Sequence, residues 1–300
     1  MHIVLFFTFD YSLVTWLKSG HLTRELKFYE YLVKKGIDVS FVTYGDDEDL
    51  EILKDSKINI FPIYSLRKKS KYKVINLLKS IFIPFSLKKK INTHSKKVII
   101  KQNQLLGSWV SIMFKIITKT KLYTRTGYDM YLFSVEEKKS FYKRLLYFLL
   151  TQVTLFFSDY YSVTSNSDKN FLKKRYLGTK KIVVRPNWVE VDLDNNEKKY
   201  GNQLLAVGRL EEQKNFHDLL YAVKETGFKV DIYGEGSLKQ ELISLSKNLN
   251  ISLNIYNNIE NDEYKNVNFT ENAKNTIKNY YSKDVIFSDY LSDFKKIIQK

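Results

Sequence analysis

Two turns, one basic and one rich in glycine, hold the residues best suited to chemistry in this chain. Gly208 and Arg209 follow an apolar run at residues 204–207, and Lys214 comes five residues after the arginine. An arginine offers a planar fork of donors to a phosphate, and a lysine offers a compact charge. These residue types indicate a site that could hold a diphosphate group without a metal ion.

The second turn, Gly234-Glu235-Gly236, ends an apolar run at residues 230–233 and leads into a helical pattern. Its backbone N–H groups lie at a helix start, which favours an anion. Strand, turn and helix occur twice in succession, which predicts two adjacent units of a parallel α/β sheet. Both turns then lie at the carboxyl ends of strands, where such sheets bind ligands. The alternative is an ordinary loop with solvated charges, since each turn alone is a weak signal.

The segments "VGRLEEQKNFHDLLYA" and "VDIYGEGSLKQEL" resemble the donor-binding half of glycosyltransferase family 4, which has the GT-B fold. The resemblance implies that Arg209 and Lys214 hold the diphosphate of a nucleotide sugar, either a UDP- or a GDP-sugar. It places Gly208, Gly234 and Gly236 beside this donor. It further implies a saccharide or lipid-linked saccharide acceptor, and no cofactor beyond the donor substrate.

The first part of the chain also alternates between strands and helices. Seven short apolar runs separated by helical segments predict a doubly wound sheet, with strands at residues 3–8, 38–43, 58–63, 98–102, 122–125, 160–163 and 182–185. A polar stretch at residues 188–201 then precedes the second series of strands, which indicates a domain boundary. "GHLTRELKFYEYLVKKGIDVSFVTYG", "SVTSNSDKNFL" and "VVRPNWVEVD" extend the family resemblance into this half.

We therefore predict an α/β protein of two Rossmann-like doubly wound domains of the GT-B type, with the C-terminal domain truncated. The expected divisions are an acceptor-side α/β domain at residues 1–186, a linker at 187–201 and a nucleotide-sugar-binding α/β domain at 202–269. Helices at residues 270–300 follow, and the resemblance implies that the last of them packs back on the N-terminal domain.

The acceptor side is expected on the loop after the fifth strand. "YTRTGYDMYLFS" places Arg125, Gly127, Tyr128 and Asp129 there, and His21 lies on the first loop. The catalytic residues stay unassigned, with Arg125 and Asp129 as candidates to orient a sugar hydroxyl or a phosphate. A salt bridge between these two residues that only shapes the loop is the alternative, and for His21 the start of a helix is the simpler interpretation.

Several classes of site and location are disfavoured by composition. The chain has 300 residues and no Cys, and its four histidines, His2, His21, His94 and His217, lack metal-ligand spacing, so no metal site is predicted. Met1 leads directly into a strand without the features of a signal peptide, which predicts a cytoplasmic protein. The longest apolar stretch, residues 145–157, is too short to span a bilayer and predicts a buried helix.

The positive charge is concentrated in one part of the sequence. Residues 57–128 contain no Asp or Glu and account for about the whole net charge of +16. Apolar residues at 74–83 alternate with these cations, which predicts a basic helix with an apolar face and an anionic membrane surface as partner. The candidate contacts are Arg67, Lys68, Lys69, Lys71, Lys73, Lys88, Lys89 and Lys90.

Two other interpretations of the basic stretch are open. A run of charge is usually a solvated face, and nucleic acid could bind at residues 66–101. The absence of a nucleic-acid-binding signature disfavours the second possibility. We therefore expect a protein attached peripherally to the inner face of the cell membrane.

The resemblance ends in the second domain. Family members carry an E-x7-E pair of carboxylates that hold the donor, whereas here "NIYNNIENDEY" passes almost directly into the closing helices. Glu263 and Glu271 have the spacing, but nothing around them matches, so we interpret them as a coincidence. The second domain thus looks shortened from within, which leaves open a catalytically inactive remnant that binds nucleotide diphosphate or membrane.

Overall fold

The computed structural model describes residues 1–91, 97–190, 202–257 and 275–299. The chain divides into two compact units, which are described separately. Unit 1 contains Met1–Glu190 and Ile277–Lys300, and unit 2 contains Val191–Thr276. Glu263 and Glu271 lie outside the described residues.

Unit 1 is built on a parallel sheet of seven strands in the order β3-β2-β1-β4-β5-β6-β7. The strand order changes direction at β1, as in doubly wound sheets. The seven predicted strands are therefore confirmed: β1 (His2–Phe6), β2 (Asp38–Thr43), β3 (Asn59–Pro62), β4 (Val98–Asn103), β5 (Lys121–Arg125), β6 (Tyr160–Val163) and β7 (Ile182–Val184).

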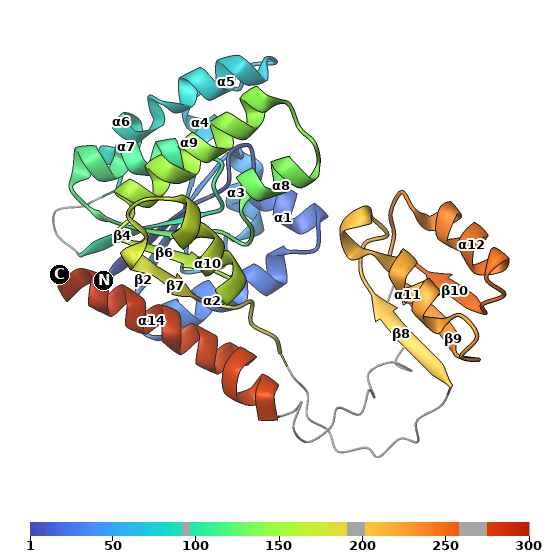
Figure 1. Cartoon of the computed structure of the whole chain (residues 1–300). Helices are drawn as coiled ribbons and strands as arrows, with labels where there is room; N and C mark the ends of the chain where they lie inside the picture. Colours follow the sequence, from blue (N-terminus) through green and yellow to red (C-terminus); the bar gives the residue numbers. More distant parts are fainter. Residues whose placement is uncertain (92–96, 191–201, 258–274, 300) are drawn as a thin grey trace. The chain divides into compact units, whose positions relative to one another are not determined.

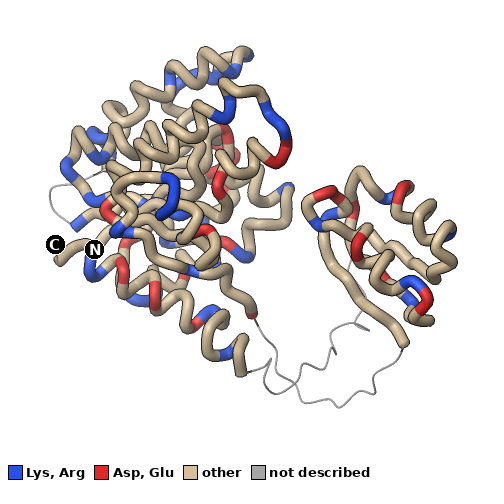
Figure 2. Tube along the Cα trace, in the orientation of Figure 1, with Lys and Arg blue, Asp and Glu red and all other residues tan. Residues whose placement is uncertain are grey.

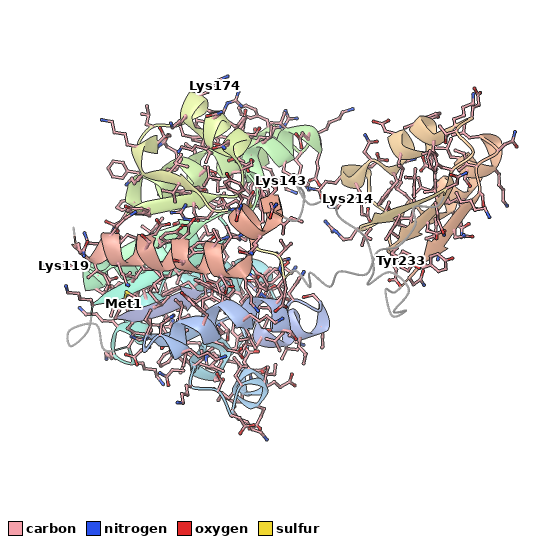
Figure 3. All side chains as sticks on the ribbon, turned by 90° about the horizontal axis from the view of Figure 1, so that it is seen from below. Met1, Lys119, Lys143, Lys174, Lys214 and Tyr233 are labelled. Carbon is pink, nitrogen blue, oxygen red and sulfur yellow. The ribbon has the colours of Figure 1, made fainter. Side chains whose placement is uncertain are left out.

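Helices cover both faces of this sheet (Figure 1). On one face α2 (Leu22–Lys34) and α14 (Lys283–Gln299) lie side by side (Figure 3). The rings of Phe28 on α2 and Phe287 on α14 have their centroids 5.0 Å apart. On the other face lie α5 (Lys73–Ser80), α6 (Ile83–Lys88), α7 (Ser108–Thr118) and α9 (Phe141–Phe157).

Shorter helices complete unit 1. They are α1 (Leu13–Lys18), α3 (Asp47–Ile52), α4 (Ile63–Leu66), α8 (Met130–Glu136), α10 (Asn166–Arg175) and the single turns η1 (Thr179–Lys181) and η4 (Ile277–Tyr281). The strands β1, β2 and β4 are buried along almost their whole length. This burial on both faces explains why their sequences read as continuous apolar runs.

The last helix is fixed to the sheet by a buried ion pair. Asp293 of α14 is 1% exposed, and its two carboxylate oxygens accept hydrogen bonds from Arg185, at 2.7 Å and 2.8 Å. The hydroxyl of Tyr123 on β5 donates to the same carboxylate at 3.1 Å. The C-terminal helix is therefore an integral part of unit 1 and completes one face of its core.

Both connections to unit 2 leave unit 1 at one place. Val189 forms a parallel bridge with Ser282, and its N–H donates to the carbonyl of Tyr281 at 2.9 Å. Glu190 forms ion pairs with Lys27 and Lys283, and these two cations lower its pKa to about 2. The segment that leads into unit 2 and the segment that returns from it are thus hydrogen-bonded to each other within unit 1.

Unit 2 has a parallel sheet of three strands in the order β10-β9-β8. Its elements are β8 (Gln203–Val207), η2 (Glu212–Lys214), α11 (Phe216–Val223), β9 (Lys229–Tyr233), α12 (Lys239–Asn248) and β10 (Leu253–Tyr256). Residues of α11 and α12 pack on one face of the sheet around the fully buried Val230 and Ile232. On the other face the buried Asp231 accepts hydrogen bonds from Gln203 and Asn254 of the two neighbouring strands.

The helix expected to be buried at residues 145–157 has an apolar outer face instead. In α9, Thr151, Thr154 and Leu155 are buried. The large side chains on the outside are Phe141, Tyr142, Leu145, Leu146, Leu149, Val153 and Phe156, and they are between 42% and 82% exposed. The prediction was wrong because α9 is apolar on both faces, so its composition does not indicate which face lies inward.

Replacement of Asp293 should destabilise unit 1 far more than replacement of its neighbour Asp289. Asp293→Ala would leave the Arg185 guanidinium without its buried partner, and we expect a loss of about 3–5 kcal/mol in the free energy of unfolding. Urea denaturation followed by tryptophan fluorescence would measure it, since the three tryptophans, Trp16, Trp109 and Trp188, all lie in unit 1.

Asp289→Ala is the matched control, because Asp289 is 46% exposed and lies 3.4 Å from the same guanidinium. Its removal should change the free energy by less than about 1 kcal/mol. Equal losses in the two variants would contradict a specific role for the buried pair.

Candidate functional site

The two predicted donor-binding turns of unit 2 pack directly against each other. The N–H of Gly208 donates to the carbonyl of Tyr233 at 3.0 Å, and the N–H of Leu210 donates to the carbonyl of Glu235 at 2.9 Å. Because Gly234 has φ +157 and a Cβ there would lie 1.9 Å from the carbonyl oxygen of Gly208, no side chain fits. A Cβ on Gly236 would lie 2.3 Å from the carbonyl oxygen of Leu210. The structure therefore gives both glycines a packing role of their own.

A carboxylate lies at the glycine-rich turn. Glu211 accepts hydrogen bonds from the N–H of Ser237 at 3.2 Å and from its hydroxyl at 3.0 Å. The sequence predicted an anion at this position, because the turn leads into helix α12. In the chain as described, the oxygens of Glu211 are the anionic group there.

The two cations of the basic turn are exposed and lie close to one another along the loop. The guanidinium of Arg209 has one neighbour, the side-chain oxygen of Gln213 at 3.4 Å. The stem of Lys214 lies over Gly208, where a Cβ would come within 3.5 Å of the Lys214 Cγ and Cδ atoms. Figure 3 shows Lys214 on the surface of unit 2. Neither cation forms an ion pair with any residue that the structure describes.

In unit 1 the acceptor-side candidates serve mainly to shape loops. Asp129 caps helix α8 by accepting a hydrogen bond from the N–H of Leu132 at 2.7 Å, and burial raises its pKa. The N–H of Gly127 donates to the side chain of Gln104 at 3.1 Å. Tyr128 is 46% exposed, and His21 lies on the surface at the start of α2. These residues stay candidates for acceptor binding, with Tyr128 the most accessible of the large ones.

Arg125 does not pair with Asp129. Its Nε donates to the hydroxyl of Tyr290 on α14 at 2.6 Å, and its second nitrogen donates to the side-chain oxygen of Asn187 at 2.5 Å. Arg125 therefore connects β5 to the last helix and to the segment that leads out of unit 1. The alternative of an Arg125–Asp129 salt bridge is wrong.

Sequence reasoning missed a cavity of about 40 Å³ beside Arg125. Its central residue is Lys101, which is 3% exposed and donates to the hydroxyl of Tyr29 at 3.0 Å and to Asn103 at 2.5 Å. Burial first, and then the nearby Arg125, lower the pKa of Lys101 to about 7. A lysine within the apolar run of β4 was the signal in the sequence, but its surroundings come from α2 and α14, far away in the chain.

Within the basic stretch, residues 73–80 form helix α5, whose polar side faces the protein. In α5 only Asn76 and Ser80 are buried. Asn76 exchanges two hydrogen bonds with the backbone of Ser70, and the hydroxyl of Ser80 accepts one from the indole of Trp109 at 2.8 Å. Large apolar side chains on α5 and on the segments beside it are between 39% and 70% exposed: Tyr72, Val74, Ile75, Leu77, Leu78, Ile81, Phe82 and Phe85.

The cations predicted to contact a membrane differ in whether they already have a partner in the protein. Lys and Arg recur along α5 and at the end of α6 (Figure 2), and Lys68, Lys71, Lys73, Lys88, Lys89 and Lys90 are exposed. Arg67 donates instead to Ser86 at 3.1 Å, and Lys69 pairs with Asp10 at 3.3 Å. Exposed lysines and exposed apolar side chains therefore occur together along α5 and α6. Within the described residues no helix is long and apolar enough to cross a membrane.

The chain has a distant relative of known activity. No family model matches it. It is 25% identical over 258 residues to the GalNAc-alpha-(1->4)-GalNAc-alpha-(1->3)-diNAcBac-PP-undecaprenol alpha-1,4-N-acetyl-D-galactosaminyltransferase of Campylobacter jejuni. The match covers 83% of this chain and 67% of the relative.

Solved structures of other glycosyltransferases have a similar fold. The lipopolysaccharide outer core galactosyltransferase WaaB has a TM-score of 0.58 and 16% identity, with 89% of this chain and 72% of that chain covered. Sucrose-phosphate synthase from Thermosynechococcus elongatus has a TM-score of 0.61 and 11% identity over 86% and 71% of the two chains. HepE from Anabaena, solved with UDP, has a TM-score of 0.55 and 12% identity over 86% and 70%.

These comparisons confirm two predictions and leave others open. The fold class, α/β with Rossmann-like domains of the GT-B type, is confirmed by the seven-stranded sheet and by these neighbours. The enzyme class, a glycosyltransferase, is confirmed by the relative together with the fold. Membership of family 4 and the loss of the E-x7-E region stay predictions.

The lowered pKa of Lys101 gives stability a specific pH dependence. The folded chain releases this proton near pH 7, whereas the unfolded chain keeps it up to the ordinary value of 10.5. Between these values unfolding takes up a proton, so the free energy of unfolding should rise with pH, by at most about 1.4 kcal/mol per pH unit.

Lys101→Met should remove this contribution, because a methionine fills a similar volume without a charge. Urea denaturation of both proteins between pH 6 and pH 10, in buffers free of phosphate, measures the difference. Wild type should gain on the variant as the pH rises, and parallel curves would contradict the lowered pKa.

Proposed function

We propose that the chain transfers a sugar from a UDP- or GDP-sugar to a saccharide or lipid-linked saccharide at an anionic membrane surface. The observation that carries the proposal is the pair of exposed cations, Arg209 and Lys214, on a loop at the carboxyl end of β8. Their charges are not used by the described fold, and they would neutralise a leaving diphosphate electrostatically. Gly208, Gly234 and Gly236 would bring the backbone close to that group.

Three further features support the donor assignment. Glu211 already shows that the glycine-rich turn accepts an anionic group, which a diphosphate could replace. Parallel sheets of this kind bind ligands at the edge where both turns lie. HepE, with a similar fold, was solved with UDP. Catalytic residues in this proposal are Arg125 and Asp129 as candidates, with His21, Gly127 and Tyr128 on the acceptor side.

The acceptor and the location rest on α5 and on the relative. The exposed apolar side chains and lysines of this surface fit a bilayer with negative headgroups. Each lysine near such a bilayer contributes about 1 kcal/mol to binding. Exposed apolar side chains favour such a surface over nucleic acid, whose backbone is contacted through charge. The Campylobacter relative is named for an acceptor linked to undecaprenol diphosphate, which supports a lipid-linked acceptor here.

A second candidate function is a remnant that binds nucleotide diphosphate without transfer. The sheet of unit 2 has three strands among the described residues, and the chain spans 67% of its relative's length. Both facts agree with a donor domain shortened from within. A shortened domain that keeps its diphosphate loops could still bind the donor and lack the groups that orient its sugar.

The donor site is tested by calorimetry with UDP and GDP. We expect Arg209→Ala and Lys214→Ala each to weaken binding by about 2 kcal/mol, because each removes a charge from the diphosphate. Lys247→Ala, at the opposite end of α12 from the loops, removes the same charge and should leave the affinity unchanged. Identical affinities for all four proteins would exclude the loop as the donor site.

Turnover of UDP- and GDP-sugars, measured alongside, separates the two functions. Hydrolysis or transfer that falls in the Arg209→Ala variant would establish the transferase. Binding without turnover would establish the remnant, and neither binding nor turnover would contradict both.

Membrane attachment is tested by sedimentation with vesicles. Wild type should bind vesicles containing anionic lipid, and less so at high salt, because salt screens the lysines. Leu78→Ser and Phe82→Ser should each reduce binding about tenfold, since a large apolar side chain contributes about 1.5 kcal/mol or more when buried. Leu177→Ser is the control, with a side chain 79% exposed in the loop after α10. Equal binding to neutral vesicles, or equal binding by all variants, would rule this surface out.

A further inference from the structure

The cavity around Lys101 holds an excess of positive charge. It lies in unit 1 between α2, α14 and the carboxyl ends of β4 and β5, and its charged lining residues are Arg24, Glu25, Lys101 and Arg125. At pH values below the Lys101 pKa of about 7, three cations therefore face one carboxylate, and at higher pH Arg24 and Arg125 still outnumber Glu25. The cavity has a volume of about 40 Å³, and one water needs roughly 10–15 Å³, so about three waters would fit. That space suits a small ion and excludes a nucleotide.

The two inner cations have neutral hydrogen-bond partners. Lys101 donates to the hydroxyl of Tyr29 and the amide oxygen of Asn103, and Arg125 donates to Tyr290 and Asn187. Neither forms an ion pair with a carboxylate of a described residue. The aromatic rings of Phe28, Tyr29 and Tyr290 lie 5.4–5.9 Å from the ammonium and contribute their π faces. Aromatic rings and hydroxyl groups lower the free-energy cost of burying a charge, but they carry no negative charge to neutralise it.

Other enclosed cations of unit 1 are paired differently. Arg185 binds both oxygens of the buried Asp293. Lys115 donates to Asp159 at 2.6 Å. Because an unpaired charge is strongly unfavourable away from water, each of these two cations has a carboxylate as its partner. The cavity of Lys101 departs from this pattern with two neighbouring cations, which is the arrangement expected where the anion is a ligand.

We propose that this cavity binds a small oxyanion of the phosphate class, either inorganic phosphate or the phosphoryl group of a larger molecule. The Arg125 guanidinium, the Lys101 ammonium and the hydroxyls of Tyr29 and Tyr290 together offer several hydrogen-bond donors, which suits an oxyanion better than chloride. Arg24, exposed at the cavity and 5.7 Å from the ring of Trp188, adds a cation from the solvent side. All lining residues of the cavity belong to unit 1 and none belongs to the donor loops, so the inference goes beyond the donor site of the proposed function.

The position of the cavity gives such an anion a structural consequence. Pro186, Asn187 and Trp188, which also line it, belong to the segment through which the chain leaves unit 1. Arg125 holds Asn187 directly. A bound oxyanion would take up donors of Arg125 and thereby act on the first residues of the connection between the units.

Calorimetry with inorganic phosphate tests the proposal, carried out in the Arg209→Ala, Lys214→Ala background so that the donor loops do not contribute. We expect phosphate to bind this protein, and chloride at equal ionic strength not to compete. Adding Lys101→Met should weaken phosphate binding at least tenfold without loss of folding, since an apolar replacement of a buried charge is tolerated. Arg24→Gln, at an exposed position, should weaken it severalfold.

Lys34→Met is the matched control, an exposed lysine on the same helix α2, and should leave phosphate binding unchanged. Methyl phosphate distinguishes the two sources of the ligand. Binding as tight as that of phosphate would assign the site to the phosphoryl group of a larger molecule, and binding of inorganic phosphate alone would assign it to the free ion. Phosphate that binds no better than chloride, or equally well after Lys101→Met, would overturn the proposal.

Discussion

The buried contact of Asp293 with Arg185 and Tyr123 is the interaction on which the rest of unit 1 depends. It fixes a helix from the end of the chain to residues that lie 108 and 170 positions earlier, and that helix supplies one side of the core and of the Lys101 cavity. Unit 2 is consequently inserted into unit 1, with both connections held together by the bridge between Val189 and Ser282. An insertion whose two ends already meet can change its internal length without disturbing its host. This arrangement gives a physical reason why a donor domain could be shortened from within while the seven-stranded sheet stays intact.

The two faces of unit 1 differ in which side chains are buried and which are exposed. On the face of α2 and α14, cations are drawn inward to a small cavity with neutral partners. On the face of α5 and α9, polar groups such as Asn76 and Ser80 turn inward and large apolar side chains turn outward. Both arrangements are unfavourable for an isolated protein in water, the first through desolvation and the second through exposed apolar surface. We propose a partner of a different kind for each, an oxyanion in one case and a bilayer in the other.

The sequence predicted the elements much better than it predicted their surroundings. The strand at Asp38–Thr43 follows from a local pattern, since an apolar run acts over a few neighbouring positions. Lys101 could be placed on its strand, but not in a cavity, because Tyr290 and Trp188 reach it only through the docking of α14. The outer face of α9 was missed for a related reason, since an apolar helix contains no information on which side meets protein. The salt bridge considered between Arg125 and Asp129 is absent because Asp129 caps helix α8, while Arg125 donates to Tyr290 and Asn187.

In the donor loops, some residues of the motif are required by the fold itself and others are not, and only the second kind points to a ligand. Gly234 and Gly236 are required for two loops to approach within contact, so their presence would be explained even if no donor bound. Glu211 likewise has a task in the unliganded chain, as a partner of Ser237. Arg209 and Lys214 are different, because the described fold does not use their charges and exposes both to solvent. A residue that the fold needs says little about a ligand, whereas a pair of charges that the fold does not need is best explained by one. The functional assignment of unit 2 therefore depends on these two side chains more than on the glycines that make the motif recognisable.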